Sequence, residues 1–432
     1  MSESIRSVPL DPVVGKSKPR FLGRFGPGLI TGAADDDPSG IATYAQAGAQ
    51  FGFGLGWTLL LTYPLMVAIQ AISARIGRTT GRGIAGNLRD HYPNWLLQSI
   101  VGTLVVANVL NLGADLGAMA EAAALMAPLP AWVYVLTFAV VCTAGQIFLK
   151  HTRYVAVLKW LTASLLAYFG TVCVVHVQWT QLVEGLLWPR LTLNRDFWLM
   201  VVAILGTTIS PYLFFWQAAQ EVEDTKAEPM REPLLRRPVQ GPDALERIRL
   251  DTAVGMGVSN LVALAIMVTA GATLRAHDIR DIETASQAAQ ALRPLAGEAA
   301  AALFALGIIG TGLLSVPVLA GSAAYALGEA RRWPVGLSRT PPQAKAFYIT
   351  IALATFLGAM ENVVSLKPLK ALVWAAVLNG IVAAPIMALI MLLSARRSIM
   401  GSFRISKALS IGGWIATGVM GAASLVFVLL SF

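Results

Sequence analysis

The sequence predicts an all-α polytopic membrane protein with about eleven transmembrane helices. Of its 432 residues, 56% are hydrophobic and only 13% are charged, and the mean hydropathy is +0.64. The apolar runs are about 20 residues long, which is the length at which a helix crosses the hydrocarbon core of a bilayer. No soluble domain of this size needs so much apolar surface.

The predicted spans are apolar runs separated by charged or proline-containing segments. They cover residues 26–53, 56–76, 97–127, 130–149, 154–177, 197–220, 251–274, 298–328, 346–364, 370–394 and 409–431. The first span is predicted to be a retained helix rather than a signal peptide, because it lacks a small-residue cleavage site and carries three acids. Helices one to six therefore fall within 26–220, and helices seven to eleven within 251–431.

Two polar stretches lie outside the spans. Residues 1–25 are polar and basic and are predicted to form a disordered cytoplasmic leader. Residues 221–250 contain four prolines, namely Pro229, Pro233, Pro238 and Pro242. Because proline at that density disfavours a folded domain, this stretch is predicted to be a cytoplasmic loop that tethers two halves of the chain.

The net charge of +9 reflects membrane topology. With the N-terminus inside, the inside segments hold 25 of the 33 Lys and Arg, the outside segments hold 7, and Lys159 lies within a span. This positive-inside pattern predicts a cytoplasmic N-terminus and anionic membrane lipid as a partner. No basic stripe with interleaved aromatic residues is present, which argues against a nucleic-acid partner. Short loops and the absence of a transit peptide favour a bacterial inner membrane.

Three consecutive aspartates, Asp35, Asp36 and Asp37, interrupt the first span. A carboxylate at mid-membrane costs roughly 2.5–3.5 kcal/mol even on lenient insertion scales, so such residues are usually functional. Pro38 follows them and removes a backbone donor, and Gly40 permits an unwound chain. An acid beside a helix break at membrane depth predicts a cation site.

The sixth span is interrupted in the same way, by small polar residues that precede Pro211. Interrupted helices at corresponding positions of two halves are the best sequence pointer to a transporter site. Spans one to five (26–177) and six to ten (about 197–394) are therefore predicted to be two repeats. Since each repeat has an odd number of spans, their topologies must be inverted.

Asp37 is the first candidate metal ligand, because no Lys or Arg in spans one or six is available to neutralise it. In span six, Pro211 frees the carbonyl of Thr207, and Ser210 lies on the same helix face. Oxygen ligands of these kinds suit a hard or borderline divalent cation. Asp36 is a further candidate ligand, and Asp35 a candidate proton acceptor, unless both acids only bond to neighbouring polar groups.

A polar stripe is predicted in span three. Asn108, Asn111 and Asp115 are spaced to share one helix face, which favours a water or proton path over simple hydrogen bonding between helices. Asn379, in span ten, is a weaker candidate for the same path. Glu329 lies near a span end and is predicted to be solvated.

The residues resemble the natural-resistance-associated macrophage protein (Nramp) family of divalent-metal transporters. The motifs that carry the resemblance are Gly26-Pro27-Gly28, Asp37-Pro38-Ser39-Gly40, Gln46-Ala47-Gly48-Ala49, the segment Ile69–Gly77 with Thr80-Gly81 and Tyr92-Pro93, and Gly312-Leu313-Leu314-Ser315 with Leu319-Ala320-Gly321. The resemblance implies a LeuT-type 5+5 inverted repeat with broken helices one and six. It also implies the import of manganese or iron together with protons.

Several residues depart from the family pattern. Gly40 stands where the family has an Asn ligand, and Ser210 stands where it has a Met ligand. Tyr212 replaces a histidine that the family links to proton movement, and Gln217 stands at a second such position. Because a thioether favours softer metals, its loss predicts tolerance of harder ions such as manganese or magnesium. Coupling to protons stays open.

Other functions fit the sequence less well. An ion-coupled carrier of a small organic solute on the same fold is disfavoured, because three acids would repel an anionic substrate. A membrane sensor that transports nothing stays open. An enzyme is the weakest alternative, since no nucleophile and base form a recognisable pair. The four histidines do not cluster, which argues against a structural zinc site. No cofactor is predicted, and the divalent ion is cargo.

Overall fold

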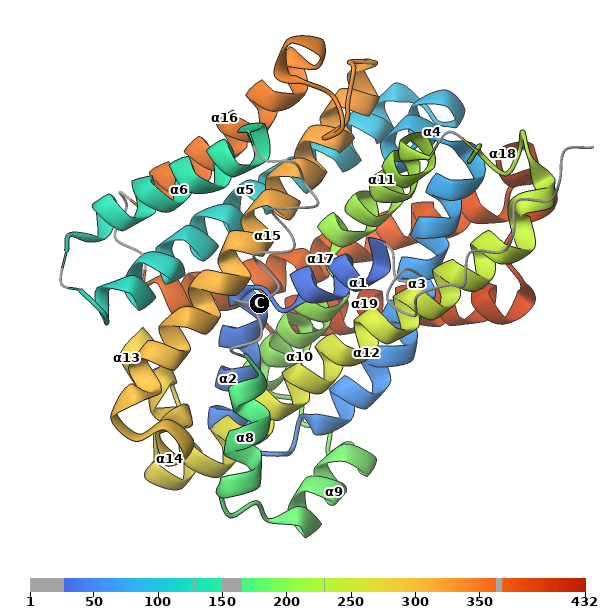
Figure 1. The fold of residues 1–432 in the computed structure, drawn as a ribbon. Coiled ribbons are helices and arrows are strands. Elements are labelled where there is room, and N and C mark those ends of the chain that lie inside the picture. The colour runs from blue at the N-terminus through green and yellow to red at the C-terminus, as the bar shows by residue number, and fades with distance from the viewer. Residues whose placement is uncertain (1–26, 128, 149–164, 229, 363–366) are drawn as a thin grey trace, which may run out of the picture.

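The computed structural model describes residues 27–432 except 128, 149–164, 229 and 363–366 (Figure 1). Every regular element within these residues is a helix. The predicted all-α class is therefore confirmed for the described part of the chain. The predicted leader over 1–25 lies outside the described residues.

Eight helical segments in the described residues are long and apolar enough to cross a membrane. They are α3 (Gly56–Thr80), α5 (Asn94–Ala124), α6 (Ala131–Phe148), α10 with α11 (Arg195–Ala227), the segment around α12 (Gly241–Thr273), the segment ending in α15 (Ala300–Arg331), α17 (Pro368–Ala395) and α19 (Lys407–Leu429). The predicted ninth span is the 17-residue helix α16 (Lys345–Glu361). The predicted fifth span lies partly outside the described residues, and its described end is α8 (Leu166–Val174).

Spans one and six are both broken, as predicted. The first divides into α1 (Pro27–Asp35) and α2 (Pro38–Phe51), and the sixth into α10 (Arg195–Thr208) and α11 (Pro211–Ala227). In each case a proline is the first residue of the second helix, where its missing N–H costs nothing and its fixed φ suits the start of a helix. The residues before the prolines, Asp37 and Ser210, have extended backbones. The proline therefore ends one helix and starts the next.

Glycines bring the broken helices unusually close to their neighbours. A Cβ atom on Gly32 of α1 would lie 2.4 Å from the backbone of Gly255 in α12. A Cβ atom on Gly206 of α10 would lie 2.0 Å from the carbonyl oxygen of Ala376 in α17 and 2.4 Å from the amide nitrogen of Gly380. Small residues let membrane helices pack backbone to backbone in this way.

The connection after α11 is shorter than the loop predicted over 221–250. Helix α11 continues to Ala227 and α12 begins at Gly241, so the segment between these two long helices runs from 228 to 240. This connection folds back onto the end of α3, because the backbone N–H of Leu234 donates to the carbonyl of Arg78 at 3.2 Å. The Arg78 guanidinium also donates to the Gln240 side chain at 2.8 Å.

The short helices gather at the two ends of the molecule (Figure 1). Helices α4 (Ile84–His91) and α18 (Arg397–Met400) lie at one end, and α9 (Trp179–Leu187), α13 (Ala285–Ala289) and α14 (Arg293–Ala296) lie at the other. Both helix breaks are buried between these ends, since Asp37 and Ser210 are each only 1% exposed.

The close contact at Gly206 gives a test of the packing. We expect Gly206→Val to destabilise the protein by about 3 kcal/mol, the upper end of the range for overpacking, because the new side chain meets backbone rather than a movable side chain. The measurement is the thermal unfolding temperature in detergent. Gly102→Val is the matched control, since a Cβ atom on Gly102 meets nothing within 4 Å. Equal unfolding temperatures for the two variants would contradict the packing.

Candidate metal centre

Asp37 occupies the first helix break and caps the start of α2. One carboxylate oxygen, Oδ1, accepts hydrogen bonds from the backbone N–H of Gly40 at 2.7 Å and from the Ser39 hydroxyl at 2.6 Å. An aspartate that precedes a helix commonly accepts from the backbone in this way. The capping interpretation of Asp37 is therefore correct for one oxygen only.

The second oxygen of Asp37 faces two other helices. Oδ2 accepts from the Tyr212 hydroxyl of α11 at 3.1 Å and from the Asn111 amide of α5 at 3.4 Å. Hydrogen-bond donors thus hold the buried carboxylate, and no cationic side chain of the described residues pairs with it. A carboxylate in this setting calls for a cation from outside the chain.

Thr207 and Gly40 lie beside Asp37, where the two helix breaks meet. The Thr207 hydroxyl is 3.4 Å from the Ser39 hydroxyl, which itself donates to Asp37. A Cβ atom on Gly40 would lie 3.2 Å from the Thr207 hydroxyl and 3.3 Å from the ring of Tyr44. The structure therefore brings Asp37, Gly40 and Thr207 together, as the sequence predicted.

Ser210 bonds to its own helix instead of facing Asp37. Its hydroxyl donates to the carbonyls of Gly206 and Thr207, each at 2.8 Å. The physical reason is Pro211, which lacks the N–H that would otherwise approach the Thr207 carbonyl. Back-bonding of this kind is common for Ser in membrane helices. The Thr207 carbonyl that the sequence predicted to be free for a metal is therefore already engaged.

Asp35 and Asp36 lie on a different side of the break from the donors to Asp37. Both accept from the Ser259 hydroxyl of α12, Asp35 at 2.7 Å and Asp36 at 3.1 Å. Both are buried, and the second oxygen of Asp35 has no hydrogen-bond partner among the described residues. The structure thus groups Asp36 with Asp35 rather than with Asp37. Ser259 was not predicted, although a Ser-Asn pair within an apolar span is a visible signal.

The predicted polar stripe on α5 faces α15 and the metal centre. Asn108 donates to the carbonyl of Leu319 at 3.0 Å, and Asp115 accepts from the Ser315 hydroxyl at 2.8 Å. Asn111, between them, donates to Asp37. The stripe is therefore continuous with the metal centre, and Ser315 is a partner that the spacing on α5 alone could not reveal.

Two other predicted residues lie apart from Asp37. Gln217 accepts a hydrogen bond from Thr31 of α1, so it joins α11 to α1 rather than lining the metal centre. Asn379 is buried in α17, and neither its amide nitrogen nor its oxygen has a hydrogen-bond partner among the described residues. Tyr212 and Gln217 stand where the Nramp family has histidines. Of these two, Tyr212 contacts Asp37 and Gln217 does not.

All donors around Asp37 are oxygen or nitrogen groups. No group of three or more His, Cys, Asp or Glu side chains in the described part of the chain is arranged to hold a metal ion. A metal at this centre would therefore rest on the Asp37 carboxylate together with neutral oxygens from the two breaks. Neutral oxygens and one carboxylate suit hard cations.

The centre is closed towards the end that carries α13 and α14. The Gln46 side chain of α2 accepts from the backbone N–H of Ile282 at 2.8 Å and donates to the carbonyl of Arg280 at 3.0 Å. The same segment is tied to α17, because Lys367 and Lys370 donate to Glu283 at 2.7 and 2.8 Å. These hydrogen bonds lower the pKa of Glu283 to about 2.

The centre is also closed towards the opposite end. Trp216, one helical turn beyond Tyr212 in α11, is fully buried. The Trp216 ring packs against Gly321 of α15, where an added Cβ atom would lie 2.7 Å from the ring. It also packs edge to face on Tyr325, with 6.2 Å between the ring centroids. The Ser322 hydroxyl of α15 donates to the Tyr212 carbonyl at 2.8 Å. Asp37 is therefore buried beneath packed side chains at this end as well.

Similar proteins were found by sequence and by structure. Residues 28–430 match the Natural resistance-associated macrophage protein-like family. The divalent metal cation transporter MntH of Aeromonas hydrophila subsp. hydrophila is 28% identical over 337 residues, which are 75% of this chain and 78% of that protein. MntH of Klebsiella pneumoniae is 25% identical over 414 residues, which are 92% of each protein.

A solved structure has a similar fold. The Eremococcus coleocola manganese transporter, crystallised with an aromatic bis-isothiourea substituted compound, superposes with a TM-score of 0.76 at 15% identity. The likeness covers 94% of this chain and 86% of that one, and it confirms the predicted LeuT-type fold. Because the family match extends over 28–430 and includes both helix breaks, the chain belongs to the Natural resistance-associated macrophage protein-like family.

Proposed function

We propose that this protein is a secondary transporter that moves divalent metal cations across a membrane by alternating access. The observation that carries the proposal is the buried Asp37 carboxylate, which lies at the junction of two broken helices and has no cationic partner among the described side chains. Similar proteins named divalent metal cation transporters support the class of cargo. Broken helices that meet at mid-membrane are the usual place for an ion site in transporters of this architecture.

Occlusion on both sides supports alternating access. The Gln46 contact covers Asp37 from one end of the molecule, and Trp216 covers it from the other. An ion bound at Asp37 would leave only after one of these contacts opens. The positive-inside pattern assigns the end near Trp216 to the cytoplasm, and bacterial relatives favour an inner membrane.

The donor set favours harder ions than those of a site that contains sulfur. The groups around Asp37 are the hydroxyls of Ser39, Thr207 and Tyr212 and the amide of Asn111. Oxygen ligands bind manganese and magnesium well and discriminate poorly between them, whereas thioethers favour softer metals. We therefore propose manganese as the principal cargo, with iron accepted and magnesium as a competitor.

Protons are the proposed coupling ion. The stripe that begins at Asp37 continues through Asn111 to Asp115, which lies further along the same face of α5. Buried acids linked by amides and hydroxyls are the usual components of proton relays in membrane proteins. Asp115 is the proposed carrier of the proton along this path.

An organic-solute carrier fits the geometry less well. Such a carrier would use the free backbone amides at the start of α2 to bind a substrate carboxylate. In this chain the amide of Gly40 already donates to Asp37, so the protein's own acid occupies the position. Asp35 and Asp36 add further negative charge next to it.

Replacement of Asp37 tests the proposal directly. We expect Asp37→Asn to lower manganese uptake into proteoliposomes by at least about 100-fold, or about 2.7 kcal/mol, because the charge that holds the ion is lost. Glu298→Gln, which changes an exposed acid outside the long helices, is the control. Undiminished uptake by Asp37→Asn would refute the proposal. An internal pH dye in the same vesicles reports proton movement, and no acidification would refute proton coupling.

Asp36 provides a sharper test of which acids hold the metal. Since Asp36 accepts from Ser259 and not from the groups around Asp37, we expect Asp36→Asn to leave manganese affinity within about threefold of the parent, a difference below about 0.7 kcal/mol. Calorimetric titration of the purified protein measures this affinity. A loss as large as that of Asp37→Asn would instead make Asp36 a metal ligand.

Competition between ions tests the donor set. We expect about a hundredfold excess of magnesium to reduce manganese uptake by at least half, because an oxygen site discriminates weakly between hard cations. Manganese uptake that magnesium does not affect would contradict this assignment.

A further inference from the structure

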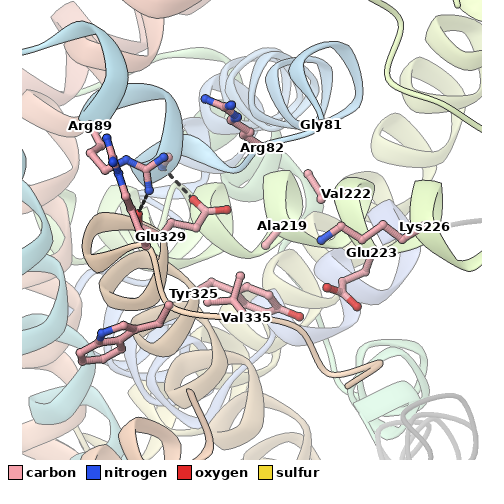
Figure 2. A pocket seen from close by; sticks show the side chains of 13 residues that line it. Gly81, Arg82, Arg89, Ala219, Val222, Glu223, Lys226, Tyr325, Glu329 and Val335 are labelled. Atoms are coloured by element: carbon pink, nitrogen blue, oxygen red, sulfur yellow. Dashed lines mark hydrogen bonds between the residues drawn. The ribbon is translucent and has the colours of Figure 1, made fainter. Parts of the chain in front are cut away.

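A cavity of about 370 Å³ lies where the ends of α3, α11 and α15 meet α4, and it is not part of the metal centre (Figure 2). Its charged lining residues are Arg82, Arg89, Lys226, Arg332, Glu223 and Glu329. All four elements end or begin on the side that the distribution of basic residues assigns to the cytoplasm.

Both carboxylates of this cavity accept hydrogen bonds from other parts of the chain. Glu329 accepts from the backbone N–H groups of Gly83 and Gly86 at 2.8 and 2.9 Å, so it caps the start of α4 instead of being solvated as the sequence predicted. Glu223 accepts from the Ser338 hydroxyl at 2.6 Å. Both acids are therefore held in place by the chain, and the four basic side chains of the cavity outnumber its two carboxylates.

The basic side chains are only partly neutralised. Arg82 and Arg89 share one acid, Asp90, and Arg89 also donates to the carbonyl of Glu329. The side chains of Lys226 and Arg332 form no hydrogen bond or ion pair of 4 Å or less within the described residues. Figure 2 shows the Lys226 side chain extending towards the middle of the cavity.

A second cavity, of about 520 Å³, continues the positive region. It shares Arg82 and Lys226 with the first cavity, and it adds the carboxylate of Glu232 and the guanidinium of Arg236, which has no ion pair among the described residues. Arg231 also lines it but is paired with Asp224 at 2.6 Å. Lys226 and Arg82 therefore place positive charge where the two cavities meet, with Arg332 in the first cavity and Arg236 in the second.

We propose that these joined cavities bind a phosphate group, supplied by an anionic lipid headgroup or by a free phosphate compound, between Lys226, Arg332 and Arg82. Arginine offers a planar set of donors that matches phosphate oxygens, and lysine adds a compact charge. The first cavity alone is large enough for a phosphate group. The three side chains come from α11, the end of α15 and the segment before α4.

The position implies an effect on transport, and this effect rests on the proposed function. Helix α11 carries Tyr212 and Trp216, and α15 carries Ser322 and Tyr325, which close the metal centre on this side. A phosphate group held between Lys226 and Arg332 would join the two helices. Since a ligand stabilises the state to which it binds better, phosphate would favour the closed state and slow metal release.

Binding is tested with the full-length purified protein and inorganic phosphate. We expect saturable binding that weakens at least about tenfold in the double variant Lys226→Gln, Arg332→Gln, because two charge-assisted contacts are lost. Arg331→Gln is the matched control, because Arg331 is exposed at the same helix end but lines neither cavity. Asp37→Asn should keep phosphate binding while losing transport, which separates this proposal from the proposed function.

A lipid arm distinguishes the two sources of phosphate. The parent and double variant are compared in nanodiscs of phosphatidylcholine alone and with added phosphatidylglycerol, and retained lipid is measured by native mass spectrometry. Greater retention of phosphatidylglycerol by the parent assigns the site to a lipid headgroup. Binding of inorganic phosphate without that difference assigns it to a free compound. If the double variant matches the parent in both measurements, the proposal is overturned.

Discussion

The rest of the structure depends on one buried carboxylate that no Lys or Arg in the described part of the chain neutralises. Asp37 accepts hydrogen bonds from its own helix, from α5 through Asn111 and from α11 through Tyr212, so three helices meet at its two oxygens. Neutral donors orient a carboxylate and lower the cost of burying it, but they do not remove its charge. The two breaks make this arrangement possible, because only an interrupted helix can turn its backbone and its first side chains towards the same point.

Close packing fixes each broken helix against a neighbouring helix. Helix α1 crosses α12 at Gly32, and α10 crosses α17 at Gly206, in both cases with backbone against backbone. These crossings also explain why Asp35 and Asp36 meet Ser259: α1 and α12 are too close for the acids at the end of α1 to face elsewhere. The aspartate triplet is therefore divided, with Asp35 and Asp36 at Ser259 of α12 and Asp37 at α5 and α11.

The features that the sequence predicts correctly, such as the helix breaks, depend on residues that are close together in the chain. A proline beside small polar residues predicts a break, and an acid beside it predicts Asp37, whatever the neighbouring helices do. Hydrogen-bond partners across helices could not be predicted, because they depend on which faces meet; Ser259 and Ser315 are examples. Ser210 shows a different limit, since the proline that marks the break also diverts its hydroxyl to its own helix. Glu329 has a polar sequence context, yet it caps a helix from another part of the chain.

The division of the aspartates constrains the ion chemistry. Three buried carboxylates would carry three negative charges, and a divalent ion at Asp37 balances only two of them. Ser259 gives Asp35 and Asp36 a single hydroxyl to share, which orients them but adds no charge. Since unbalanced charge at membrane depth is costly, the remaining charge must be met by a proton or a second cation. If the metal binds through Asp37, at least one further positive charge must be accommodated in the same break. This requirement gives the proposed coupling of metal to protons a physical basis.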